Sequence, residues 1–109
     1  MNRAMLFLSG CVSAAGLAGP AVAQQRVPLE LVLAMDVSTS VDAAEFQLQQ
    51  VGLAGAFLEP SIQAAIKATG GVAISVVQWA GEGSAVTSVN WEFIETTEQM
   101  MRLSDRIFA

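Results

Sequence analysis

A nearly continuous apolar run leads at once into a polar loop and then into a helical pattern. Residues Leu29 to Met35 predict a strand, and the scarcity of polar residues in it is typical of a strand covered on both faces, as in a parallel sheet. The loop that follows is Asp36-Val37-Ser38-Thr39-Ser40. A buried strand that passes through a loop into a helix is a building unit of α/β folds.

An amphipathic helix is predicted from Asp42 onward. Asp42 and Glu45 have the spacing of a capping box, although Asp stands where Ser or Thr is usual. The helix should end near Glu59, because the proline that follows disfavours helical geometry in the residue before it. Gln47 and Gln49 are predicted to lie away from the apolar stripe. That stripe holds Phe46, Leu53, Ala54, Phe57 and Leu58.

The next part of the chain predicts a short helix, a second buried strand and an antiparallel partner for that strand. The helix covers 61–68, and Val72 to Trp79 is a strand rich in β-branched residues. After a glycine-rich turn, Val89, Trp91 and Phe93 alternate with polar residues, as in a half-exposed edge strand. Both tryptophans are predicted to pack in the core or against the neighbouring strand. The short turn makes the last strand a hairpin partner of the second.

A final helix begins at Thr96 or Thr97 and is expected to turn its apolar side chains inward. Those side chains are Met100, Leu103, Ile107 and Phe108. Strand, helix, strand, hairpin and helix together predict the α/β class, with a partly parallel central sheet and an antiparallel edge strand.

The first 23 residues have the features of a secretory signal peptide. Arg3 gives a positive start, 4–18 is apolar or small, and Ala21-Val22-Ala23 is a cleavage signal. The apolar stretch is shorter than the roughly 20 residues that a membrane span needs. We therefore expect cleavage after Ala23, a periplasmic or secreted product, and no stable membrane span after cleavage.

A second processing site stays open as an alternative. Leu8-Ser9-Gly10-Cys11 is similar to a bacterial lipoprotein site, in which Cys11 would carry the lipid. That cleavage would leave only 4–10 as the apolar core of the leader, at the short end of the usual range.

The composition of 24–109 excludes several classes of partner and site. Its 86 residues carry four basic and ten acidic side chains, a net charge of −6. Nucleic acid is disfavoured as a partner, because binding it requires Lys and Arg to neutralise phosphates. The single Cys lies in the leader, so 24–109 offers neither a disulfide nor a thiolate metal site.

The loop after the first strand offers oxygen ligands for a metal. Asp36 supplies a carboxylate, and Ser38 and Ser40 supply hydroxyls. Hard divalent cations such as Mg²⁺ take oxygen ligands, and one or two protein carboxylates with waters and partner oxygens are the usual set. The alternative is a turn in which these side chains only satisfy backbone groups.

Catalytic patterns are missing. Ser38 stands on a strand-to-helix turn but lacks the glycines of a GxSxG nucleophile elbow. The chain contains no His, so a Ser-His-Asp triad cannot be completed within it. Gly81-Glu82-Gly83 lacks the third glycine and the helix of a dinucleotide-binding loop. We therefore predict a binding protein and not an enzyme, with no catalytic and no organic-cofactor-binding residues.

Asp36-Val37-Ser38-Thr39-Ser40, between a strand and an amphipathic helix, resembles the DxSxS loop of a von Willebrand factor type A domain. More narrowly, 31–42, Val76-Val77-Gln78-Trp79-Ala80-Gly81 and Trp91 are similar to a bacterial secreted family of unknown function, DUF1194. The resemblance covers 24–109. It implies the front half of a Rossmann-like von Willebrand factor A fold, truncated at residue 109.

In von Willebrand factor type A domains the loop is the first segment of a metal-ion-dependent adhesion site. The resemblance implies that Ser38 and Ser40 bind Mg²⁺ or Mn²⁺ directly, that Asp36 does so directly or through water, and that an acidic group of a partner protein is a further ligand. It also implies a Thr and a second Asp on two later loops, which we expect beyond residue 109. The threonines and the aspartate of the last third lie where the family does not put these ligands; they are Thr87, Thr96, Thr97 and Asp105.

The function implied by this resemblance is an exported, divalent-metal-dependent protein-binding or adhesion module. Two alternatives come from other classes. One is a structural domain of the cell envelope that binds no metal, and the other is a metal-assisted hydrolase completed by residues beyond 109.

Overall fold

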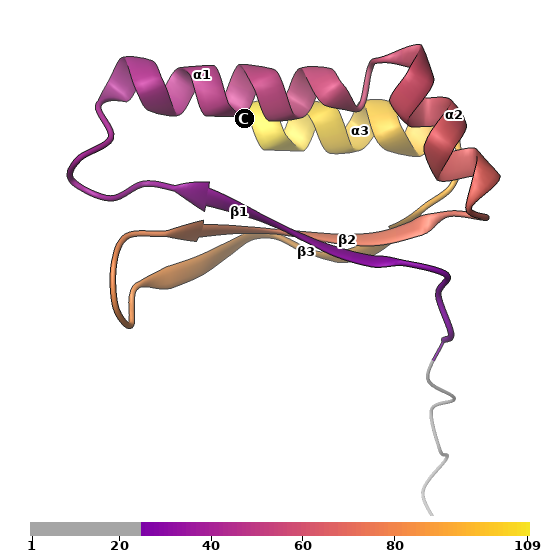
Figure 1. Cartoon of the computed structure of the whole chain (residues 1–109), viewed down its shortest axis with the longest axis horizontal. Coiled ribbons are helices and arrows are strands. Elements are labelled where there is room, and N and C mark those ends of the chain that lie inside the picture. Colours follow the sequence, from indigo (N-terminus) through magenta and orange to yellow (C-terminus); the bar gives the residue numbers. More distant parts are fainter. Residues whose placement is uncertain (1–24) are drawn as a thin grey trace, which may run out of the picture.

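The structure, a computed structural model, describes residues 25–109 as three strands and three helices (Figure 1). The predicted leader, with Cys11 and the cleavage site after Ala23, lies outside the described residues. The predicted elements are all present, and the second strand has the predicted bounds. In chain order they are β1 (Glu30–Asp36), α1 (Ala43–Ala56), α2 (Pro60–Ala68), β2 (Val72–Trp79), β3 (Ala85–Ile94) and α3 (Thr97–Phe108).

The strands form one sheet in the order β1-β2-β3. β1 and β2 are parallel, with Asp36 opposite Trp79 at their carboxyl ends. β2 and β3 form an antiparallel hairpin. Its turn contains Gly81 and Gly83 at φ 94° and 73°, where a side chain would strain the backbone. The predicted mixed α/β class, with a partly parallel sheet and an antiparallel edge strand, is confirmed.

The three helices all lie on one face of the sheet, and the core fills the space between the two layers (Figure 1). Ile74 and Val76 of β2 belong to the same buried cluster as Met100, Leu103 and Ile107 of α3. These three side chains of α3 face inward as predicted. Fully burying one such side chain contributes roughly 1.5–3 kcal/mol, so the burial of these side chains holds α3 against the rest of the domain. No helix in residues 25–109 has the length and apolar character to cross a membrane.

The prediction that β1 is covered on both faces is wrong for residues 25–109. Met35 is buried, but 52 % of Val32 is exposed. The reason is that the helices cover only one face, and β2 is the only described strand that pairs with β1. An apolar run shows that a strand can be covered on both faces. It does not show that another element lies on each face to cover it.

The alternation predicted in β3 is also wrong. Val89 is buried while 54 % of Trp91 is exposed, so the two side chains do not share one covered face. The sheet register shifts between Ile74 and Val76 and again between Val76 and Val77. Each shift adds one residue to β3, which has 10 residues where β2 has 8. The tryptophan of β2 is exposed as well, so neither tryptophan packs in the core.

The helix ends differ from prediction in two places. α1 ends at Ala56, earlier than Glu59, and Leu58 therefore falls outside its apolar stripe and is exposed. Phe108, the last residue of α3, is exposed too and does not face inward. The predicted start of α3 is confirmed, because the Thr96 hydroxyl accepts a hydrogen bond from the Gln99 backbone amide.

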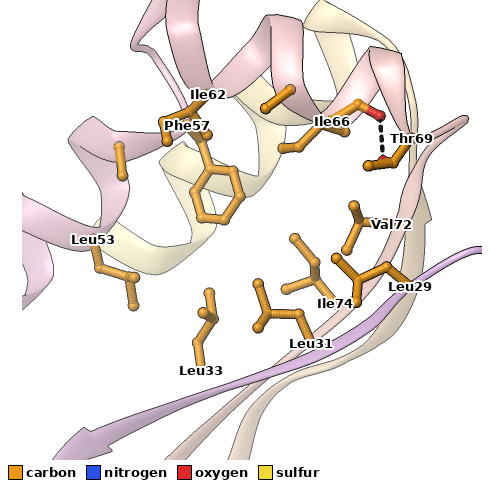
Figure 2. A pocket seen from close by; sticks show the side chains of 12 residues that line it. Leu29, Leu31, Leu33, Leu53, Phe57, Ile62, Ile66, Thr69, Val72 and Ile74 are labelled. Carbon is orange, nitrogen blue, oxygen red and sulfur yellow. Dashed lines mark hydrogen bonds between the residues drawn. The ribbon is translucent and has the colours of Figure 1, made fainter.

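An apolar pocket of about 320 Å³ lies between the sheet and helices α1 and α2 (Figure 2). Its walls are aliphatic side chains, with the ring of Phe57 among them. Thr69 is its one polar lining residue, and the Thr69 hydroxyl already donates to the Ile66 carbonyl. The pocket reaches Leu29 and Leu31 at the amino-terminal end of β1, so it lies at the end of the strand away from the polar loop.

Candidate metal site

The loop between β1 and α1 lies at the carboxyl end of the parallel strands, at the same end of the sheet as the hairpin turn (Figure 1). The Val37 amide donates to the Trp79 carbonyl at 2.8 Å, so the chain leaves the sheet beside the end of β2. The Val41 amide donates to the Ser38 carbonyl at 3.0 Å and closes a turn. Ligands in open α/β sheets bind at the carboxyl ends of strands. The loop therefore has the position of a binding site.

Hydrogen bonds bring the three predicted ligand residues together. The Asp36 carboxylate accepts a hydrogen bond from the Ser38 backbone amide at 2.8 Å. The Ser38 and Ser40 hydroxyl oxygens are 3.1 Å apart and share a hydrogen bond. Asp36 and Ser38 are half-buried and Ser40 is exposed, so the group is open to solvent on one side.

The environment of Asp36 favours its ionised form. The Ser38 hydroxyl, and after it the Ser38 backbone amide, hold the pKa of Asp36 below its ordinary value of 3.8. Partial burial acts in the opposite direction and is outweighed. Asp36 is therefore a carboxylate at neutral and mildly acidic pH, which is the form that binds a cation.

The two hydroxyl oxygens are spaced as neighbouring ligands of one small cation would be. In an octahedral shell with metal–oxygen distances of about 2.1 Å, adjacent oxygens lie about 3.0 Å apart. The Ser38 and Ser40 oxygens, at 3.1 Å, match that separation. Two hydroxyls and an ionised carboxylate are hard oxygen donors, so this donor set fits Mg²⁺ or Mn²⁺.

This loop does not form a carboxylate-rich site. Within residues 25–109, no three His, Cys, Asp or Glu side chains gather where they could hold a metal ion. A divalent cation held by one carboxylate and two neutral hydroxyls keeps a net positive charge. Such a cation attracts a further anionic oxygen.

Asp42, the next carboxylate along the loop, is engaged in capping α1. Its Oδ1 accepts from the Ala44 and Glu45 amides at 2.8 and 2.9 Å. The Glu45 carboxylate accepts in turn from the Asp42 amide at 2.9 Å. The predicted capping box is thus confirmed, and Asp42 fixes the start of α1 directly after the loop.

The threonines that do not match the family pattern lie in other elements. Thr87 is in β3 opposite Val77. The Thr96 hydroxyl caps α3, and the Thr97 hydroxyl accepts from the Lys67 ammonium at 2.7 Å. Asp105 is in α3. Hydrogen bonds tie none of these four described residues to the Asp36–Ser40 loop.

Gln49 is the functional candidate that the sequence prediction misses. The prediction that its side chain lies away from the apolar stripe of α1 is wrong. The Gln49 side-chain oxygen accepts from the Asp36 amide at 3.1 Å, and its nitrogen donates to the Asp36 carbonyl at 2.9 Å. Gln49 follows Phe46 by three residues and precedes Leu53 by four, and both of these pack against the core. That spacing is the signal that places Gln49 on the sheet-facing side.

Comparisons with known proteins give one match. A family model described as "Protein of unknown function (DUF1194)" matches residues 26–109, which is most of the chain and includes the whole Asp36–Ser40 loop. Searches of curated proteins and of solved structures found no match. The chain therefore belongs to the DUF1194 family of proteins of unknown function.

Proposed function

We propose that this protein is an exported binding module that uses a divalent cation, Mg²⁺ or Mn²⁺, to hold an acidic group of a partner protein. The observation that carries the proposal is the 3.1 Å separation of the Ser38 and Ser40 hydroxyl oxygens beside an ionised Asp36. These groups lie on a partly exposed loop at the carboxyl end of a parallel strand pair. The fold proposed for the whole domain is that of von Willebrand factor type A.

Each group has a distinct role in this proposal. Ser38 and Ser40 bind the cation directly through their hydroxyl oxygens, and Asp36 neutralises part of its charge directly or through a water molecule. Water fills the remaining positions until a partner carboxylate replaces one of them. Because the cation keeps a net positive charge, an acidic partner group is favoured over a neutral one.

The second candidate is a structural domain of the cell envelope in which the loop binds no metal. One observation favours it, namely that the loop groups already satisfy one another. The Asp36 carboxylate accepts from the Ser38 amide, and the two serine hydroxyls share a hydrogen bond. Such bonds are typical of polar turns without ligands.

Calorimetric titration with Mg²⁺ and with Mn²⁺ separates the two candidates. The exported protein should bind both ions, and Asp36→Ala should abolish or strongly weaken binding. Asp42→Ala is the matched control, because it removes a nearby loop carboxylate that only caps α1. It should lower stability by about 1 kcal/mol and leave cation affinity unchanged. Equal affinities of Asp36→Ala and the unsubstituted protein would leave the structural domain as the better account.

A further inference from the structure

Within residues 25–109, the backbone amide and carbonyl of Asp36 are bonded by a side chain and not by a strand. The Val37 amide points to β2, where it donates to the Trp79 carbonyl. Successive residues of a strand point their backbone groups to opposite sides. The amide and carbonyl of Asp36 therefore point away from β2, toward the edge of β1 that no strand of residues 25–109 covers, called its free edge below. Both are met there by the Gln49 amide, at 3.1 and 2.9 Å.

The Gln49 amide is thus in the position that the peptide group of a neighbouring strand would occupy. Its oxygen accepts and its nitrogen donates, which is the same exchange that a paired strand provides. This contact joins α1 to the last residue of β1 across 13 positions of sequence. A strand added at the free edge of β1 would have to stop before Asp36, which leaves the loop open.

We infer that Gln49 is a positioning residue of the candidate cation site. This inference rests on the proposed function and adds a residue that does not touch the cation. By fixing both backbone groups of Asp36, Gln49 fixes the direction in which the Asp36 carboxylate leaves the strand. The site is then arranged before the cation arrives, and binding does not have to order it. Partners that orient metal ligands in this way typically contribute 10–100-fold in metal affinity.

The chain offers a matched control for this inference in the next residue. Gln50 is on the same helix, and its side-chain nitrogen donates to the Ile107 carbonyl at 3.3 Å. A substitution there also removes a hydrogen bond between distant parts of the chain but does not touch Asp36. Methionine has nearly the shape of glutamine without its amide, so Gln49→Met and Gln50→Met form the comparison.

The first readout is the Mn²⁺ dissociation constant of the full exported protein. It is measured under conditions in which circular dichroism shows that both variants are folded. Gln49→Met should raise it about tenfold or more, and Gln50→Met should change it less than about twofold. The second readout needs no metal. Amide hydrogen exchange at Asp36 should be slow in the unsubstituted protein and in Gln50→Met, and fast in Gln49→Met.

A third measurement uses the unsubstituted protein, so the inference stays testable even if Gln49→Met does not fold. Titration with Mg²⁺ should shift the side-chain amide NMR signals of Gln49 and leave those of Gln50 in place. Unmoved Gln49 signals, or equal affinities of the two variants, would overturn this inference while the proposed function stands. If the unsubstituted protein binds no cation, the proposed function fails and this inference fails with it, even where Asp36 exchange is slow.

Discussion

The hydroxyl oxygens of Ser38 and Ser40 lie 3.1 Å apart at the carboxyl end of β1, on the loop that leads into α1. Asp36, two residues before Ser38, is the last residue of the strand. Hydrogen bonds with Gln49 and with Ser38 hold it in place. The distance between the hydroxyls is small enough for both to bind one cation.

Removing either serine hydroxyl should weaken cation binding. Ser38→Ala and Ser40→Ala should each raise the Mn²⁺ dissociation constant at least about tenfold. The loss of a direct ligand should weaken binding at least as much as the loss of a residue that only orients a ligand. Thr39→Ala is the control, since Thr39 lies between the two serines and is exposed. Calorimetry on the three variants provides the measurement. If all three variants lost the same affinity for Mn²⁺, the loop would affect binding only through its backbone turn and not through the serine hydroxyls.

The lowered pKa of Asp36 predicts how its contribution to stability depends on pH. A carboxyl whose pKa is lower in the folded state stabilises the fold above its unfolded value, here 3.8. That contribution is lost as the pH falls through the lower, folded pKa. The difference in free energy of unfolding between the protein and Asp36→Asn should therefore be constant near neutral pH and shrink below pH 3.8. Urea denaturation at a series of pH values measures it, and a difference that grows on acidification contradicts the assignment.

Gly71 should not tolerate a side chain. Its φ is +100°, and an added Cβ would overlap the ring of Phe93. Gly71→Ala should therefore lower the free energy of unfolding by about 1–3 kcal/mol. Gly52→Ala is the contrasting control, because its Cβ would meet nothing within 4 Å and alanine favours the helix. It should raise stability by up to about 1 kcal/mol. Thermal or urea unfolding compares the two, and equal effects would contradict the packing around β2.

The exposed face of β1 should promote association of residues 24–109. Val32 is 52 % exposed on a strand that pairs on one side only within the described residues. Exposed apolar strands at a sheet edge are templates for pairing with other chains. Val32→Lys should therefore shift sedimentation profiles toward monomer. Leu48→Lys is the control, since Leu48 is also exposed but lies on α1. A monodisperse monomer without any substitution would disprove this expectation.

The local patterns of the sequence were sufficient to predict the helices and strands and the side chains that α3 contributes to the core. The capping residues Asp42 and Thr96 mark helix starts by their own hydrogen bonds to the backbone, which depend on neighbours in sequence. Met100 and Leu103 follow from the helical period. Asp36, Ser38 and Ser40 were also found together, because a loop of five residues keeps its side chains close whatever the rest of the fold does.

Most of the errors concern relationships between distant parts of the chain. The bulges of β3 depend on its register with β2, and no residue spacing within β3 encodes that register. The exposure of Val32 depends on whether another element covers it. The prediction places Gln49 away from the apolar stripe, although its spacing from Phe46 and Leu53 is that of an inward residue. Its partner, the backbone of Asp36, becomes visible only when α1 is placed on the sheet.

Anomalous diffraction from crystals soaked in Mn²⁺ tests the central claim most directly. The account predicts a peak at the carboxyl end of β1, about 2.1 Å from both the Ser38 and Ser40 hydroxyl oxygens, with Asp36 bound directly or through one water molecule. The same peak should be missing from crystals of Asp36→Ala. A loop without a peak, at a Mn²⁺ concentration that gives peaks at other carboxylates, would contradict the account and leave Asp36, Ser38 and Ser40 as residues of a structural turn.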